Sequence, residues 1–370
     1  MKKVWIVSDC IFSPLGNTTR ETFDNVVSGN SGVCQFDDSD LDVEGFWGAR
    51  IKEFVSYSGA TRFEAFCTYV IQSILRSTEL PLSRSILILS TTKGNIELLE
   101  QHRADHPRIH LHAVARYLAD KFSFKDVQVV SNACISGVMA VLVARRLIQG
   151  GRFDHAIVIG ADILSRFVIA GFQSLQALSP ELCRPFDSDR KGINLGECAA
   201  AVIVTSKPQN LESNRRYSIL GGGLSNDANH ISGPSRTGEE LAFAIQSAMD
   251  ENHLSVSDID FISAHGTATI YNDEMEAKAF GRMGLDGISI NSMKGYFGHT
   301  LGAAGLLELA MCCESLARDT LIPTLGFEKL GVSQPINVVQ TVEHRKMNIC
   351  LKTASGFGGC NSAIILQKDF

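Results

Sequence analysis

The chain has 370 residues, of which 45% are hydrophobic and 20% charged, so it is long enough to bury a large core. Acidic residues outnumber basic ones by 40 to 34, which gives no general attraction to nucleic acid. No segment reaches about 18 uninterrupted apolar residues, and we therefore predict no membrane span.

Cysteine usage indicates a reducing compartment. The ten cysteines include no C-x-x-C pair, and their spacing resembles neither a zinc ligand set nor a disulfide framework. We therefore expect a cytoplasmic protein with reduced thiols, most of which fill the core.

Strand-like runs rich in valine and isoleucine alternate with helical patterns in the first half of the chain. We predict strands at residues 4–7, 85–92, 127–132, 155–163 and 199–206. We predict helices at residues 60–75 and 136–151, the second of which ends at a pair of glycines. This alternation indicates an α/β fold with buried central strands.

The second half repeats this plan after a polar stretch at residues 206–218. In residues 128–144 a strand pattern passes through a polar turn into an apolar helix, and residues 288–310 follow the same course. Residues 155–163 and 349–359 then supply the next core strand of each half. If two copies of one unit pack together, the two equivalent turns meet at a shared centre.

Cys134 lies in the first of these turns, between a predicted strand and the helix after it. At the start of a helix, unpaired backbone amides and the helix dipole favour a thiolate, and the same amides can stabilise an oxyanion. The alternative is a small hydrophobic core residue, as we expect for most of the other cysteines. The polar motifs elsewhere in the chain decide between the two.

One such motif, "SAHGTATIYNDEMEAKAF" (263–280), places His265 directly after a predicted strand. The threonines offer hydroxyls to a polar ligand, and the acidic residues suit the positive end of a helix. These side chains are Thr267, Thr269, Asp273 and Glu276.

Two more motifs follow predicted strands. Residues 291–310 contribute Lys294 and His299 beside glycines that allow close packing, and residues 355–363 form a glycine-rich turn around Phe357. That turn lacks the lysine of a P-loop, so we expect its amides to approach a reacting carbonyl. A capped histidine, an ion-paired lysine and a space-filling phenylalanine are the structural alternatives. Because these motifs all stand at strand ends, where α/β folds build their sites, one shared active site is the stronger interpretation.

Together these motifs resemble those of the β-ketoacyl-[acyl carrier protein] synthases, decarboxylating condensing enzymes of fatty acid and polyketide synthesis. The matching stretches, in order along essentially the whole chain, are "NACISG", "RPFDSDRKGINLGE", "AHGTAT", "KGYFGHTLGAAGLLE" and "GFGGCN". The resemblance implies a thiolase fold with two βαβαβαββ halves in five layers, α-β-α-β-α. We expect residues 1–208 to carry the nucleophile and residues 215–370 to carry the two histidines.

The resemblance to the elongating, Cys-His-His type of synthase also implies a role for each residue. Cys134 takes the acyl group from acyl carrier protein, and His265 and His299 assist decarboxylation of malonyl carrier protein. The resemblance further implies that Lys294 tunes the histidines and that Glu308 pairs with this lysine. The backbone amides of Cys134 and Phe357 would form the oxyanion hole, and the Phe357 ring would act as a gate. The phosphopantetheine tunnel would be lined by Thr267, Thr269 and Phe172, and the carrier docking surface would include Arg62.

The expected partners are acyl carrier protein and a second synthase-like subunit, either a copy of this chain or a chain-length factor. We expect no metal or redox cofactor, since the substrates carry phosphopantetheine and loss of CO₂ drives the bond formation. The chain departs from the family in a shortened stretch before the nucleophile strand, in Gln176 where an arginine is common, and in Cys360 where a threonine is usual.

Three alternatives to a self-contained synthase stay open at this point. The chain could be the catalytic half of a synthase/chain-length-factor heterodimer that makes a specialised product. A non-catalytic partner subunit characteristically lacks the nucleophile, whereas Cys134 is present here. A cysteine thioester hydrolase would use one histidine, and the second histidine with its lysine argues for decarboxylation instead.

Overall fold

Two halves with the same order of core elements follow each other in the computed structural model, which describes residues 2–101, 103–211, 215–228 and 233–369. The core elements of the first half are β1 (Trp5–Phe12), α2 (Arg62–Ser77), β4 (Ser85–Ser90), α4 (Leu111–Lys121), β5 (Asp126–Val130), α5 (Ser136–Gln149), β6 (His155–Asp162) and β8 (Cys198–Thr205). Those of the second half are β9 (Tyr217–Asn226), α7 (Glu239–Asp250), β10 (Phe261–Ser263), α8 (Ile270–Arg282), β11 (Ser289–Asn291), α10 (Ala304–Arg318), β15 (Ile349–Gly356) and β16 (Cys360–Lys368). Both halves thus have the expected order βαβαβαββ.

Shorter elements extend this frame at its surface and near the cavity described below. They are α1 (Thr19–Val27), β2 (Val33–Asp38), β3 (Val43–Ala49), α3 (Ile96–Glu100), α6 (Arg166–Ser174), β7 (Leu195–Gly196), α9 (Lys294–Phe297), β12 (Thr320–Leu321), β13 (Asn337–Val338) and β14 (Glu343–His344).

The sheet order shows the duplication directly. The core strands of the first half run β5-β4-β6-β8-β1 and those of the second run β11-β10-β15-β16-β9, with β13 added at the edge. Counted by position within each half, the two orders are identical. Strands β4, β6 and β8 are buried along their whole length, as continuous apolar strands in an α/β fold should be. The two sets of strands join where β1 pairs with β9, at Trp5–Ser218 and Ile6–Tyr217.

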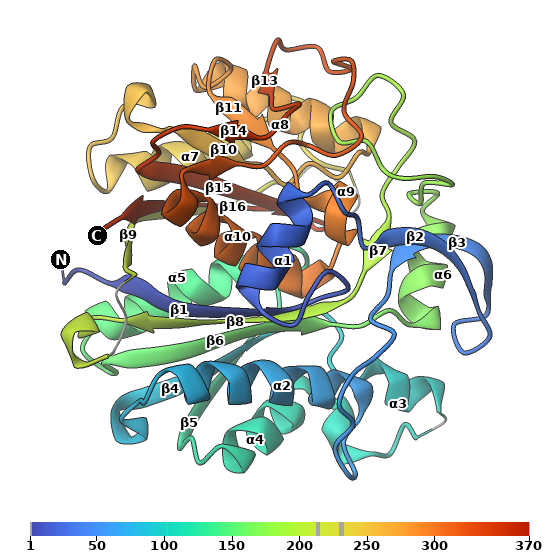
Figure 1. Cartoon of the computed structure of the whole chain (residues 1–370), viewed down its shortest axis with the longest axis vertical. Coiled ribbons are helices and arrows are strands. Elements are labelled where there is room, and N and C mark those ends of the chain that lie inside the picture. The colour runs from blue at the N-terminus through green and yellow to red at the C-terminus, as the bar shows by residue number, and fades with distance from the viewer. Residues whose placement is uncertain (1, 102, 212–214, 229–232, 370) are drawn as a thin grey trace.

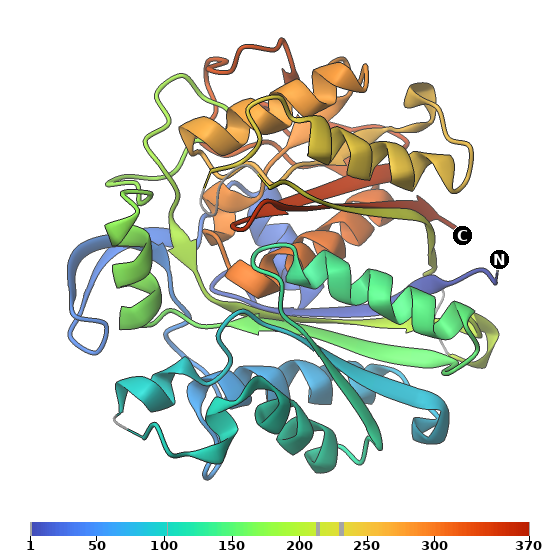
Figure 2. The same cartoon turned by 180° about the vertical axis from the view of Figure 1, so that it is seen from behind.

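Helix and sheet layers alternate through the molecule (Figures 1 and 2). Helices α2 and α4 cover the outer face of the first set of strands, and α7, with α8 beside it, covers the outer face of the second. Helices α5 and α10 lie between the two sets, where α10 contacts both β8 and β15. This is the five-layer arrangement that we expected from the resemblance.

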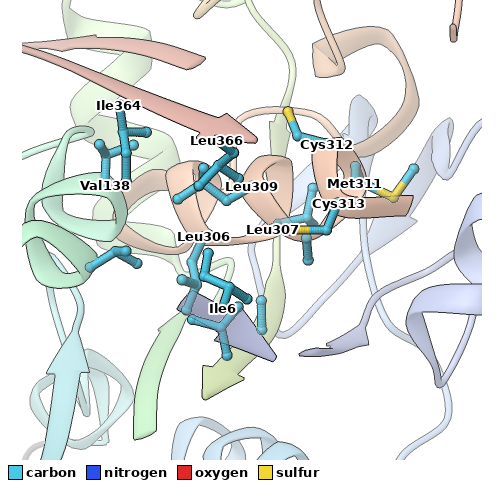
Figure 3. Packing of buried hydrophobic residues seen from close by; sticks show 14 of the residues in the cluster. Ile6, Val138, Leu306, Leu307, Leu309, Met311, Cys312, Cys313, Ile364 and Leu366 are labelled. Atoms are coloured by element: carbon cyan, nitrogen blue, oxygen red, sulfur yellow. The ribbon is translucent and has the colours of Figure 1, made fainter. Parts of the chain in front are cut away.

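The central layer determines where the two halves meet. Helix α10 is buried on nearly every side, and Figure 3 shows Val138 of α5 and Leu306 of α10 in one cluster with Ile364 of β16. The two helices approach closely at Gly137, where a Cβ atom would lie 2.6 Å from the Leu306 amide nitrogen. Because both helices begin at this contact, the residues just before them are brought together.

The observed elements lie close to the predicted ones. Strand β1 is longer than expected and runs to Phe12, and α2 starts at Arg62 because Thr61 and Glu64 form a capping box. The predicted division between the halves falls between β8 and β9, and residues 212–214 of that stretch lie outside the described residues. Among the helices of the described residues, none is long and apolar enough to cross a membrane.

Candidate active site

Cys134 lies in a tight turn between β5 and α5. Ala133 takes a positive φ of 44°, which is unfavourable for a residue with a Cβ and must be held by its surroundings. The Ser136 hydroxyl closes the turn, accepting from the Asn132 amide at 2.8 Å and donating to the Ala133 carbonyl at 2.6 Å. The turn places the thiol at the start of α5, beside the start of α10.

His299 lies between α9 and α10, and the first half of the chain fixes its backbone. Its amide donates to the Asn194 carbonyl at 2.7 Å, and its carbonyl accepts from the Gly196 amide at 3.1 Å. In this position its Nε2 lies 2.9 Å from the Cys134 Sγ. The nucleophile and the first candidate base are therefore in hydrogen-bond contact, as activation of a thiol requires.

His265 follows β10 and meets His299 edge to face. The ring centroids are 5.1 Å apart and the ring planes are inclined by 81°. One nitrogen or sulfur atom from each of Cys134, His265 and His299 lies within 4.8 Å of the others. By distance alone these three groups could also hold a metal ion, and no other three His, Cys, Asp or Glu side chains of the described residues come as close.

Two buried carboxylates of α8 hold the loop that carries His265. The amides of His265 and Gly266 donate to the two oxygens of Glu276 at 2.8 and 2.6 Å. Asp273 accepts from the amides of Thr267 at 2.9 Å and Phe186 at 2.7 Å. We expected these acids to serve the helix dipole; their main contacts are with loop amides.

Burial keeps the reacting groups neutral. It raises the pKa of the Cys134 thiol to about 12, although the ammonium of Lys294 and the backbone amide of Phe357 favour the thiolate. Burial and the nearby ammonium groups also hold the pKa of both His265 and His299 well below the usual value of 6.5. We expected the helix start to favour a thiolate, but the effect of burial is larger, and the resting pair is a neutral thiol beside a neutral imidazole.

Behind the histidines lies a cluster of three buried charges that we call the charge triad: Lys294, Glu308 and Lys352. Lys294 pairs with one oxygen of Glu308, as expected, and Lys352 lies 2.8 Å from the other oxygen. The two ammonium groups lower the pKa of Glu308 in spite of its burial, so it is ionised. Lys352 was not among the residues predicted from the sequence, although a lysine inside the apolar strand "ICLKTAS" was a signal of a buried charge.

The glycine-rich turn between β15 and β16 covers the nucleophile. A Cβ atom on Gly356 would lie 2.9 Å from the Cys134 backbone nitrogen, so only glycine allows this approach. The backbone amide of Phe357 lies close enough to the Cys134 sulfur to favour its thiolate. Phe357 is 41% exposed as a residue, and its ring stacks on that of Phe172 of α6 with centroids 5.7 Å apart.

A cavity of about 490 Å³ connects these groups to the surface. Cys134, His265 and His299 line it, and so do the predicted tunnel residues Thr267, Thr269 and Phe172 and the predicted gate Phe357. The hydroxyls of the two threonines lie 2.8 Å apart. The structure therefore brings the residues predicted to touch substrate into one cavity.

Comparison with known proteins gives a consistent result. Residues 114–210 match the family "Beta-ketoacyl synthase, N-terminal domain" and residues 217–328 match "Beta-ketoacyl synthase, C-terminal domain". A Streptomyces cyaneus protein named as a polyketide beta-ketoacyl synthase is 34% identical in an alignment of length 288 that covers 72% of this chain and 67% of that protein. The 3-oxoacyl-[acyl-carrier-protein] synthase 2 of Vibrio cholerae is 27% identical over 99% of both chains. This chain belongs to the β-ketoacyl synthase family.

Solved structures agree with this membership. The ishigamide ketosynthase/chain length factor and a β-ketoacyl synthase from Burkholderia phymatum each superpose with a TM-score of 0.89, at 25% identity over 100% of both chains. The predicted thiolase fold and the predicted enzyme class are thus confirmed: the chain is a condensing acyltransferase of the β-ketoacyl synthase family.

Arg62 is the predicted site residue that the structure places elsewhere. Its guanidinium pairs with the fully buried carboxylate of Glu197 and lies over the rings of Phe54 and Phe66, with its side chain only 16% exposed. A guanidinium bound in this way has little surface to offer a carrier protein, so the structure lends no support to the docking role of Arg62, which stays a prediction. Gln176, the departure from the common arginine, does line the cavity.

Proposed function

We propose that this synthase holds an acyl group as a thioester on Cys134 and condenses it with malonyl-acyl carrier protein, giving 3-oxoacyl carrier protein and CO₂. The observation that carries the proposal is the contact of 2.9 Å between Cys134 Sγ and His299 Nε2, with His265 beside them in the same cavity. A nucleophile with two imidazoles suits a reaction that needs both acyl transfer and decarboxylation.

In the first half-reaction, His299 Nε2 accepts the thiol proton as the Cys134 sulfur attacks the acyl carrier thioester. The carbonyl oxygen becomes an oxyanion, which the amides of Cys134 and Phe357 stabilise. The tetrahedral intermediate then breaks its bond to the carrier sulfur, which leaves with the proton from His299. The buried thiol, with its pKa near 12, makes this proton transfer necessary.

In the second half-reaction, malonyl carrier protein enters and its thioester oxygen faces His265 and His299. The bond to the carboxylate breaks, CO₂ leaves, and the electron pair forms an enolate whose oxygen accepts hydrogen bonds from the two neutral imidazoles. The enolate carbon then attacks the acyl thioester, and the Cys134 sulfur leaves as a thiolate, which takes up one proton from solvent and becomes the neutral thiol again. The nearby ammonium of Lys294 stabilises the negative charge that develops.

Partners and cofactors follow from this chemistry. We propose acyl carrier protein as the carrier of both substrates, a cytoplasmic location, and no metal or redox cofactor, because each step above balances without one. Two of the similar structures are ketosynthases named together with a chain length factor: the ishigamide protein and the ApeO–ApeC pair from Xenorhabdus doucetiae, the latter at 26% identity. The catalytic half of such a heterodimer is therefore our second candidate, beside a homodimer.

Intact-protein mass spectrometry with CO₂ detection tests the proposal. The purified chain is offered acyl carrier proteins of graded chain length, then malonyl carrier protein, with the Cys134→Ala variant as control. We expect an acyl mass increase that the control lacks, followed by CO₂ and 3-oxoacyl carrier protein. Hydrolysis of the thioester without CO₂ release would indicate a hydrolase and refute the proposal.

A further inference from the structure

Lys352 is a buried charge that the two half-reactions above do not use. It lies on β15 opposite Ser263 of β10, and its side chain is 0% exposed. Burying an ammonium group is costly unless it is paired and fully hydrogen-bonded, and a strand between two helix layers is normally apolar. Its presence here calls for a physical reason.

The Lys352 ammonium binds the end of the strand that presents His265. Its Nζ donates to the carbonyl of Ser263 at 3.2 Å, of Ala264 at 3.1 Å and of Thr353 at 2.7 Å. Ser263 and Ala264 are the two residues directly before His265. Because β10 ends at Ser263, the lysine acts as a cap on the carbonyls where the strand gives way to the loop.

On its other side, Lys352 completes the charge triad. It lies 2.8 Å from Oε2 of Glu308, whose other oxygen binds Lys294. Glu308 therefore links the cap on the His265 strand to the lysine at the start of α9. With two ammonium groups and one carboxylate, the triad carries a net positive charge of one next to both imidazoles.

We propose that Lys352 is a positioning residue for the decarboxylation half-reaction, holding His265 through the carbonyls of Ser263 and Ala264 and fixing Lys294 through Glu308. This inference rests on the proposed function. Acylation uses the Cys134–His299 pair and the oxyanion amides, and Lys352 makes no hydrogen bond to these groups within the described residues. Its influence on His299 is electrostatic, whereas it holds the residues before His265 by direct hydrogen bonds. Loss of Lys352 therefore affects decarboxylation much more than acylation.

The test compares Lys352→Met with Lys368→Met, which removes a lysine from the neighbouring strand β16 that pairs with Asp319 at 3.1 Å. Acylation is followed by mass spectrometry, and CO₂ release is measured from pre-acylated enzyme over a range of malonyl carrier concentrations. For Lys352→Met we expect the maximal rate of CO₂ release to fall between about 10- and 100-fold, since a small misplacement of a catalytic group has effects of this size. The malonyl carrier concentration that gives half the maximal rate should stay within about twofold of the wild-type value, and so should the acylation rate. Every rate of the control variant should do the same.

Three results would overturn the inference. The first is a Lys352→Met rate of CO₂ release equal to that of the wild type. The second is an equal loss in acylation and CO₂ release, which is the signature of a merely structural role. If Lys352→Met does not fold, Lys352→Gln, whose amide can still donate to a carbonyl, replaces it, and its loss in CO₂ release is compared with its loss in acylation in the same way. The third is wild-type enzyme that neither acylates nor releases CO₂, which would refute the proposed function itself.

Discussion

The loops after β4 and β10 occupy equivalent places in the two halves, and buried carboxylates hold both. In the first half, Asp162 at the end of β6 accepts from the amides of Thr92 at 3.0 Å and Gly302 at 2.7 Å. In the second half, Glu276 of α8 holds the amides of His265 and Gly266. The first loop contributes packing between the halves, whereas the second presents an imidazole.

The strand beside each loop shows the same division. Gly160 of β6 lies opposite Ser90, at the place where Lys352 of β15 lies opposite Ser263. A Cβ atom on Gly160 would come within 3.1 Å of the Ala303 Cα, so this position lets the start of α10 pack directly on β6. At the equivalent position, Lys352 is one of the three residues of the charge triad. Duplication thus supplied two similar frames, one used for close packing and one for charge.

The largest expected effect comes from the nucleophile in the first half. Cys134→Ala should lower the rate of condensation by about a thousandfold or more, because the thioester cannot form, while the fold stays intact. Product formation is measured by mass spectrometry and folding by circular dichroism. Cys134→Gln, which places an amide where the acyl thioester stands, should release CO₂ from malonyl carrier protein without condensation. Condensation by Cys134→Ala would contradict our assignment of the nucleophile.

The two histidines should separate the half-reactions. His299→Ala should slow acylation and CO₂ release by about a hundredfold or more, because the thiol loses its proton acceptor at 2.9 Å. His265→Ala should slow CO₂ release by a similar factor and leave acylation nearly unchanged. Rapid-quench measurement of both steps distinguishes them. Equal behaviour of the two variants in both steps would mean that the contact with Cys134 does not set their roles.

The loop carboxylates provide a smaller, matched comparison. Asp162→Asn and Glu276→Gln should each lower the free energy of unfolding by about 1–3 kcal/mol, because each removes buried hydrogen bonds to backbone amides. Urea unfolding measures this change. Only Glu276→Gln should also lower CO₂ release markedly relative to acylation, since its loop carries His265. A larger loss of CO₂ release in Asp162→Asn would show that the first loop serves the chemistry as well.

The smallest expected effect is that of pH on the reaction rate. Because the pKa values of His265 and His299 lie well below 6.5, both imidazoles stay neutral at pH 8 and at pH 6.5. The maximal rate of CO₂ release should therefore be flat over this range. The free energy of unfolding, by contrast, should depend on pH. Below about pH 6.5 the unfolded chain binds protons that the folded imidazoles do not, so stability falls with decreasing pH. A rate that halves near pH 6.5 would contradict neutral histidines.

Much of the site could be predicted from the sequence. The positions of Cys134 and His265 after core strands, and the pairing of Lys294 with Glu308, follow from chain order, strand patterns and the family motifs. His299 was also expected at a strand end, but it lies between α9 and α10. The structure places these side chains together because the starts of α5 and α10 meet at Gly137. Helix capping by Thr61 was equally local and moved the start of α2 by two residues from the predicted one.

The partners of charged side chains could not be predicted in this way. Arg62 follows the cap of α2 and could have pointed outwards, but Glu197, distant in sequence, binds its guanidinium inside the protein. Lys352 finds its acceptors on β10 because that strand lies beside β15. In both cases the decisive contact joins segments far apart in the chain.

By itself, therefore, the sequence determined the duplicated βαβαβαββ plan and the residue types that stand at the strand ends, since both depend on patterns of a few neighbouring residues. The tertiary structure alone decided that the Cys134 thiol is neutral, that Arg62 faces inwards and that Lys352 joins the charge triad. Protonation and ion pairing depend on burial and on which distant groups share a buried space, and these are properties of the packed molecule.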